Sequence, residues 1–140
     1  MLAPREASIF ACVVDTIAAP APVLPPVSQT DCAFFFDRWM AAAPAVNARG
    51  MRLLLYVVEL MPLALGYGAR LRRLPVEARV RYFKALEHSS NANVRQLTKL
   101  LKGAALLAYY GDEAIMRRVG YDPDERLARG RELRQREGRP

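Results

Sequence analysis

The chain has 140 residues, of which 52% are hydrophobic and 25% are charged, and its formal net charge is +7. This is the length of one ordinary domain, and the composition is typical of a folded globular protein rather than a disordered one. The longest apolar run, residues 53–65, is too short to cross a bilayer and contains Glu59 and Pro62, so we expect no transmembrane segment.

Proline and glycine divide the sequence into segments with helical periodicity. In chain order, the predicted helices span residues 5–18, 29–43, 44–65, 75–87, 92–110 and 113–119. Four prolines in residues 19–26 predict an extended connector after the first helix. Ser28 is a residue type that favours a helix N-cap, and we expect it to begin the second helix. Pro44 is suited to the first turn of the third.

The helix predicted over residues 92–110 has apolar residues at the spacing that lines a bundle seam: Val94, Leu97, Leu101, Ala104 and Ala108. Gly111 is expected to end this helix, and Asp112 to cap the short one that follows. No segment alternates with the period of a strand. We therefore predict an all-α fold, a compact irregular bundle of five or six helices over residues 1–122. An Arg/Glu-rich tail over residues 123–140, with a helical pattern over 123–137, is expected to be helical or partly disordered.

Residues that could carry catalysis are few. His88 is the only histidine and stands at the end of a predicted helix, where a cation is favourable. Cys12 and Cys32 lie in apolar surroundings and form no redox or zinc-binding motif. We expect no catalytic residue and no metal in this chain.

Two further patterns contain residue types that could carry chemistry. Glu59 is a carboxylate within an apolar helix and is a candidate for proton transfer, but pairing with Arg52 or Arg70 is its expected role. Residues 66–71 begin like a dinucleotide-binding fingerprint but lack its third glycine and its preceding strand. We therefore expect no cofactor in this chain.

Aromatic residues are the feature that stands out. One Trp, six Tyr and five Phe are more than we expect a core of this size to bury completely. Tyr and Trp with Arg nearby are common anchors of protein interfaces. The candidate partner-binding residues are Trp39, Tyr67, Arg70, Arg73, Tyr109, Tyr110, Asp112 and Tyr121.

Basic residues in the segment 70–84 could instead contact phosphates. They occur without a helix-turn-helix signature and without the aromatic-basic interleaving that suits single strands. A solvated or partner-facing rim is the favoured interpretation, and a nucleic-acid-binding module remains an alternative.

Residues 71–123 carry several motifs in a particular order: a Leu-Pro helix start, Leu-Ala-Tyr-Tyr-Gly-Asp at residues 107–112, and Gly-Tyr-Asp-Pro at residues 120–123. This segment resembles the helical region ahead of the flavin-binding domain in long-chain alcohol oxidases of the glucose-methanol-choline (GMC) oxidoreductase family. It is also similar to the small subunit of gluconate dehydrogenase. Residues 15–26, Asp-Thr-Ile-Ala-Ala-Pro through Pro-Pro, fit the same pattern.

The resemblance implies a non-catalytic small subunit that binds and stabilises a flavin-dependent alcohol, sugar or sterol oxidoreductase chain. It implies FAD in that partner chain and a hetero-oligomer, and it carries over no catalytic residue. A cytoplasmic location is expected, because Asp15 interrupts the apolar segment 9–19 and Glu6 offsets Arg5 ahead of it. A helical adaptor for an unrelated partner is the other interpretation.

Overall fold

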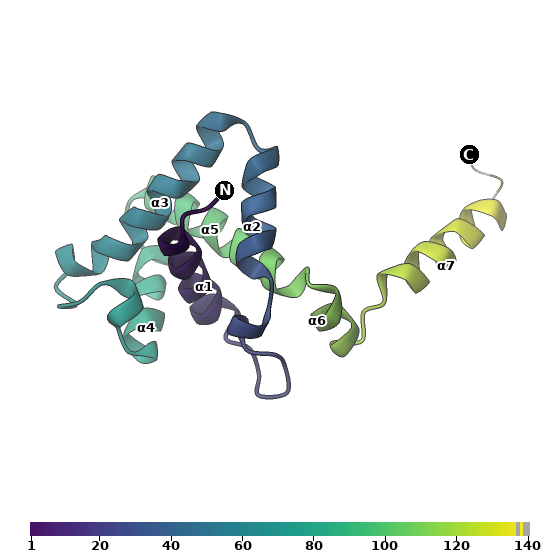
Figure 1. Ribbon diagram of the computed structural model, residues 1–140, viewed down its shortest axis with the longest axis horizontal. Coiled ribbons are helices and arrows are strands. Elements are labelled where there is room, and N and C mark those ends of the chain that lie inside the picture. The colour runs from purple at the N-terminus through teal and green to yellow at the C-terminus, as the bar shows by residue number, and fades with distance from the viewer. Residues whose placement is uncertain (137, 139–140) are drawn as a thin grey trace.

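Seven α-helices joined by loops make up the computed structural model, which describes residues 1–136 and 138 (Figure 1). The helices are α1 (Pro4–Ala18), α2 (Cys32–Ala42), α3 (Ala45–Ala64), α4 (Val76–Glu87), α5 (Ala92–Tyr110), α6 (Glu113–Arg118) and α7 (Pro123–Arg136). Two short 3-10 turns, η1 (Val27–Gln29) and η2 (Leu71–Arg73), lie in the connections. The described residues contain no strand, so the all-α prediction is confirmed.

Helix α1 lies at the centre of the bundle and contacts α2, α3, α4 and α5. Its inner face consists of Ile9, Phe10, Val13 and Val14, all of which are fully buried. The Phe10 ring stacks on Phe36 of α2 with 3.9 Å between ring centroids and 9° between planes. Each of these side chains contributes roughly 1.5–3 kcal/mol by burial, so α1 organises the core.

Local sequence signals set most of the helix ends. The Asp112 carboxylate accepts hydrogen bonds from the backbone N–H of Ala114 (2.9 Å) and Ile115 (3.3 Å), which is the predicted cap of α6. A Cβ atom at Gly111 would collide with the Leu107 carbonyl oxygen, so only glycine fits the exit from α5. Both predictions are therefore confirmed.

The predicted start of the second helix at Ser28 is wrong. Ser28 lies inside η1, and α2 begins at Cys32 with Asp31 in the N-cap position. The backbone of Thr30 is extended between the two elements, with φ −112° and ψ 157°. Pro26 starts η1, and this short turn separates the proline connector from the helix.

The apolar seam predicted for α5 is wrong at one position, because Leu97 is 47% exposed. Thr98 is buried in its place, along with Leu101, Ala105 and Ala108. Thr98 can be buried because its hydroxyl donates to the Val94 carbonyl oxygen at 2.7 Å within the same helix. Leu97 therefore belongs to the outer surface of the bundle.

Two tyrosines connect distant parts of the core. The hydroxyl of Tyr82 donates to the Val58 carbonyl oxygen (3.1 Å), and that of Tyr109 donates to the Pro25 carbonyl oxygen (2.6 Å). Both side chains are fully buried. Burial raises the pKa of both phenols, because the phenolate form would lose its hydration.

We expect the free energy of unfolding to fall as the pH rises above 10.0, the ordinary pKa of tyrosine. Tyr82 and Tyr109 hold their protons in the folded state, whereas the unfolded chain releases them, so ionisation favours unfolding. Urea titrations at about pH 9 and about pH 11 would measure this loss. The double variant Tyr82→Phe/Tyr109→Phe should show a smaller loss. An equal loss in the parent chain and in this variant would contradict the prediction.

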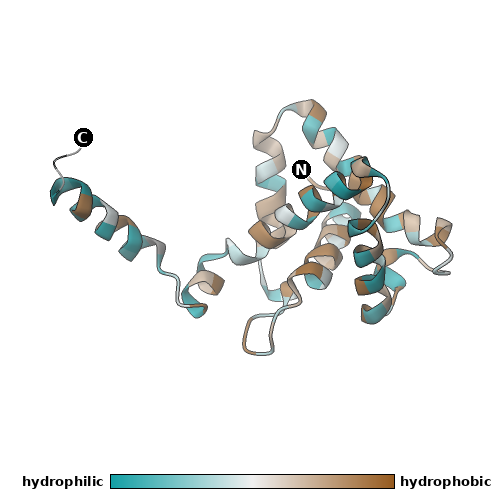
Figure 2. Ribbon diagram, turned by 180° about the vertical axis from the view of Figure 1, so that it is seen from behind, coloured by the Kyte–Doolittle hydropathy of each residue, from teal (hydrophilic) through white to brown (hydrophobic). Residues whose placement is uncertain are grey.

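Helix α7 projects away from the bundle and is mostly hydrophilic (Figures 1 and 2). The Asp122 carboxylate caps it by accepting from the backbone N–H of Asp124 (3.0 Å) and Glu125 (3.3 Å). The tail is thus helical over residues 123–136, and residues 137, 139 and 140 of the predicted tail lie outside the described part of the chain. Among the described helices, none has the length and hydropathy that crossing a bilayer requires.

Candidate partner-binding surface

Helix α3 is apolar on two faces, and the bundle covers only one of them. The inner face includes Met51, Leu54, Leu55, Val58 and Pro62, which are all buried. The outer face includes Val46, Leu53, Val57 and Leu60, which are all exposed. These outer residues, together with Gly50, recur every three or four positions, which is the spacing of a stripe that packs against another helix.

Helix α5 presents a similar outer face. Leu97, Leu100 and Leu107 are each about half exposed, and no acidic residue occurs between Ala92 and Tyr110. Single exposed leucines are ordinary on protein surfaces, but apolar faces on two neighbouring elements indicate an interaction site.

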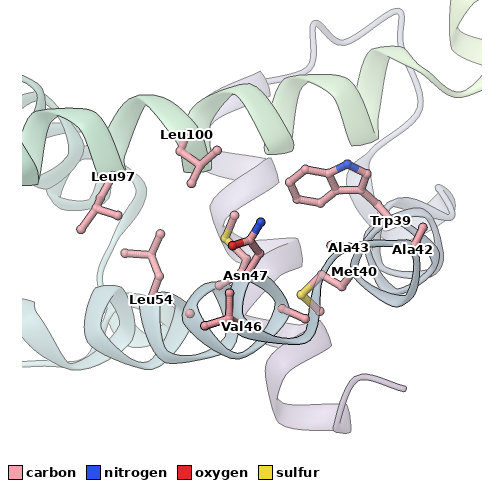
Figure 3. Close-up of a pocket in the computed structure, with 12 residues that line it drawn as sticks. Trp39, Met40, Ala42, Ala43, Val46, Asn47, Leu54, Leu97 and Leu100 are labelled. Carbon is pink, nitrogen blue, oxygen red and sulfur yellow. The ribbon is translucent and has the colours of Figure 1, made fainter.

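A hollow of about 560 Å³ lies between these two helices and the α2–α3 corner. We call it the α3–α5 groove and define it by six of its lining residues: Trp39, Val46, Gly50, Leu54, Leu97 and Leu100. Figure 3 shows Leu97 and Leu100 projecting from α5 on one side, and Val46 and Leu54 from α3 on the other. None of the residues that line the groove is charged.

A second hollow, of about 570 Å³, adjoins the first at Trp39, which lines both. Phe34, Arg38 and Asp112 also line it. Phe34 is 61% exposed, and the guanidinium of Arg38 lies 5.8 Å from the centre of its ring. Trp39, at 39% exposed, therefore stands between two concave surfaces, a position typical of an interface anchor.

The structure brings some of the predicted binding residues together. Trp39 and Asp112 line the second hollow, and Tyr110 is 39% exposed at the end of α5. Tyr109 is different, because its ring is fully buried and its hydroxyl is bonded to Pro25. Tyr109 is therefore a core residue and exposes no surface to a partner, which corrects its prediction as a binding residue.

The remaining predicted residues lie elsewhere. Tyr67 is half-buried, with its ring edge-on to Tyr82 at 5.8 Å. Arg70, just before η2, and Arg73, its last residue, are both exposed. Tyr121 is exposed after α6, with the Arg126 guanidinium 4.9 Å from its ring centre. Figure 1 places the α3–α4 and α6–α7 connections at opposite sides of the bundle, and none of these four residues lines either hollow at Trp39.

Sequence reasoning missed the outer faces of α3 and α5. Leu53, Val57 and Leu60 were not among the candidates, because aromatic residues were the signal considered. A usable signal was present in α3, which has one acidic residue in 20 positions and apolar residues on all sides. A helix with that pattern is normally covered all round.

The buried carboxylate of Glu59 is held by an arginine other than those predicted. Arg72 Nε donates to Glu59 Oε1 at 3.0 Å, and the Arg72 backbone N–H donates to Oε2 at 3.3 Å. Arg52 instead donates to the Met1 carbonyl oxygen. Arg72, rather than Arg52 or Arg70, reaches Glu59 because η2 packs against α3. The prediction that Glu59 pairs with an arginine is therefore confirmed, and its partner is Arg72.

The other reactive residues are scattered. His88 is exposed, with its Nδ1 2.8 Å from the Lys84 carbonyl oxygen at the end of α4. Cys12 and Cys32 are free thiols, and burial raises the pKa of both despite the Arg79 guanidinium 3.3 Å from the Cys12 sulfur. Within the described residues, no three metal-binding side chains gather at one point.

The surface around Trp39 can thus bind apolar groups. Searches against protein-family models, curated proteins and solved structures found no match to this chain.

Proposed function

We propose that this protein is a non-catalytic small subunit that binds and stabilises a flavin-dependent oxidoreductase chain of the GMC type. The observation that carries the proposal is the exposed apolar surface formed by α3, α5 and Trp39. Apolar faces of this kind are stable in water when a partner covers them. The kind of partner comes from the resemblance of residues 15–26 and 71–123 to helical segments of GMC enzymes.

In this proposal the partner chain is catalytic, and the small subunit binds and covers part of its surface. The partner binds FAD and oxidises an alcohol, sugar or sterol. The bundle covers an apolar region of the partner with Trp39 and the leucines of α3 and α5. Covering that region removes apolar area from water on both chains, which stabilises the partner in its flavin-binding conformation.

The test is co-expression with a flavin-binding chain encoded beside this one. We expect the two chains to elute together and to show visible flavin absorbance, and we expect this chain alone to show none. Omitting this chain should leave the partner insoluble or unable to retain FAD. A partner that is soluble, flavin-loaded and fully active by itself would contradict the proposal, and stable elution with a chain that binds no flavin would favour the adaptor interpretation.

A further inference from the structure

We propose that a small cavity between α1, α4 and α5 is a binding site for a short-chain monocarboxylate. We call this cavity the lysine pocket. Side chains from all three helices line it: Thr16, Ile17, Val80, Phe83, Lys84, Glu87, Thr98 and Lys102. None of these residues lines either hollow at Trp39, so the inference is independent of the proposed function.

The packing of three helices creates the lysine pocket. Helices α1, α4 and α5 contact one another. The four lining residues of α4, at positions 80, 83, 84 and 87, have the spacing of one helix face. The cavity has a volume of about 210 Å³, below the roughly 300–1,000 Å³ of sites for drug-sized ligands. It therefore suits a molecule of a few carbon atoms, and it is too small for a flavin or a nucleotide.

The charges in the lysine pocket favour an anion. Lys102 is paired with Glu87, whereas Lys84 has no ion-pair partner among the described residues. Two ammonium groups and one carboxylate give the lining a net charge of +1, which a single carboxylate of a ligand would neutralise.

The choice of cation also fits a small site. Lys84, Lys99 and Lys102 are the only lysines among 21 basic residues, and two of the three line this pocket. The ammonium group of lysine is a compact point charge on a flexible stem, so it suits a small cavity better than the planar guanidinium of arginine does.

The apolar part of the lining favours a hydrocarbon body on that anion. Phe83 is 6% exposed, and Ile17 and Val80 are half-buried. These three side chains form an apolar wall of the pocket. A short alkyl chain would leave water by contacting this wall while its carboxylate meets the ammonium groups.

Hydrogen bonding argues against a phosphate-like anion. The hydroxyls of Thr16 and Thr98 donate to carbonyl oxygens of their own helices, at 2.8 Å and 2.7 Å, so they are not donors to a ligand. The ammonium groups are then the side-chain donors of the pocket. Phosphate carries more charge and more acceptor oxygens than these groups satisfy, and the Glu87 carboxylate would repel it.

The probe is sodium butanoate, titrated into the full chain and followed by two-dimensional amide NMR spectra. We expect saturable shifts at Ile17, Phe83 and Thr98, with a Kd of about 1 mM, because so small a ligand makes few contacts. Three other compounds each lack one feature: butanol has no charge, butylammonium has the opposite charge, and inorganic phosphate has no apolar body. Each should bind about tenfold more weakly than butanoate or worse.

Variants of the chain locate the binding. Lys84→Met removes the charge and keeps a long apolar stem, and it should weaken butanoate binding about tenfold. The matched control is Lys99→Met, the same substitution at an exposed lysine outside the pocket, which should leave the affinity unchanged. Thermal unfolding of each variant would confirm that it is folded.

Glu87→Gln separates a binding role of the lysines from a structural one. This variant frees Lys102 from its ion pair and raises the net charge of the lining, so butanoate should bind about threefold more tightly or better. If the Glu87–Lys102 pair served only to hold α4 against α5, its removal would lower stability and bring no gain in affinity.

Four results would overturn the inference. They are the absence of a saturable shift with butanoate, equal binding of phosphate and butanoate, equal weakening in Lys84→Met and Lys99→Met, and tighter binding of acetyl-glutamate amide than of butanoate. The last result would assign the pocket to a glutamate side chain of another protein. None of the four bears on co-elution with a flavoprotein, which tests the proposed function separately.

Discussion

Replacing Phe10 with alanine is expected to lower the free energy of unfolding by about 3–5 kcal/mol. The Phe10 side chain is fully buried in α1 and stacks on Phe36, so its removal leaves a cavity between the central helix and α2. Marginal domains have about 5–15 kcal/mol of stability, so the loss is a large fraction of the total. Urea unfolding followed by circular dichroism would measure it.

The matched control is Phe34→Ala. Phe34 lies in α2 with 61% of its side chain exposed, so its removal creates no cavity and should change stability by about 0.5 kcal/mol or less. The two variants delete the same atoms from the core and from the candidate surface. Equal destabilisation by both would contradict this division between core and surface.

Replacing Arg72 with alanine is the second large change, with an expected loss of about 3 kcal/mol. The Glu59 side chain is 1% exposed and would keep only the backbone N–H of residue 72 as a close donor. A buried carboxylate without its cation is costly, because the charge has lost both its hydration and its counter-ion. Chemical unfolding of the variant would show the loss.

Two comparisons separate a broken buried pair from a general effect of losing an arginine. The double variant Glu59→Leu/Arg72→Met removes both charges and should recover much of the stability. Arg117→Ala breaks an exposed i,i+4 pair with Glu113 and should cost about 0.5 kcal/mol or less. If Arg72→Ala were as mild as Arg117→Ala, the Glu59 pair would not be a structural element of the core.

Core and surface variants also have different consequences for the proposed complex. Phe10→Ala and Arg72→Ala act through folding, so they should reduce partner binding only as far as they unfold the small subunit. Leu100→Glu changes an exposed side chain and should reduce binding while the unfolding transition is unchanged. Measuring stability and binding on the same samples distinguishes the two effects.

Much of the helical framework could be predicted, because helix ends depend on neighbouring residues. Helix α5 spans the predicted 92–110, with Asn91 accepting a hydrogen bond from the Asn93 backbone at its start and Gly111 at its exit. The cap of α6 at Asp112 likewise depends only on residues close to it in sequence. The start of α2 was missed, because both Ser28 and Asp31 have the character of an N-cap and the intervening 3-10 turn depends on the chain around them.

The candidate surface could be predicted only in part. Trp39 was identified by residue type, and the structure places it between two hollows. Tyr109 and Tyr110 are adjacent in sequence and identical in chemistry, yet one is fully buried and the other is partly exposed. Consecutive residues of a helix point about 100° apart, and only the position of the neighbouring helices determines which of them is covered.

The sequence by itself determined that this protein is all-α, where most of its helices end, and that its reactive residues are few, because these properties depend on residue types and local spacing. The tertiary structure decided that Thr98 rather than Leu97 enters the core, that Arg72 rather than Arg52 or Arg70 holds Glu59, and that α3 keeps an uncovered apolar face. These outcomes depend on how α1, α3, α5 and η2 pack together, and contacts between segments distant in sequence leave no mark in local periodicity.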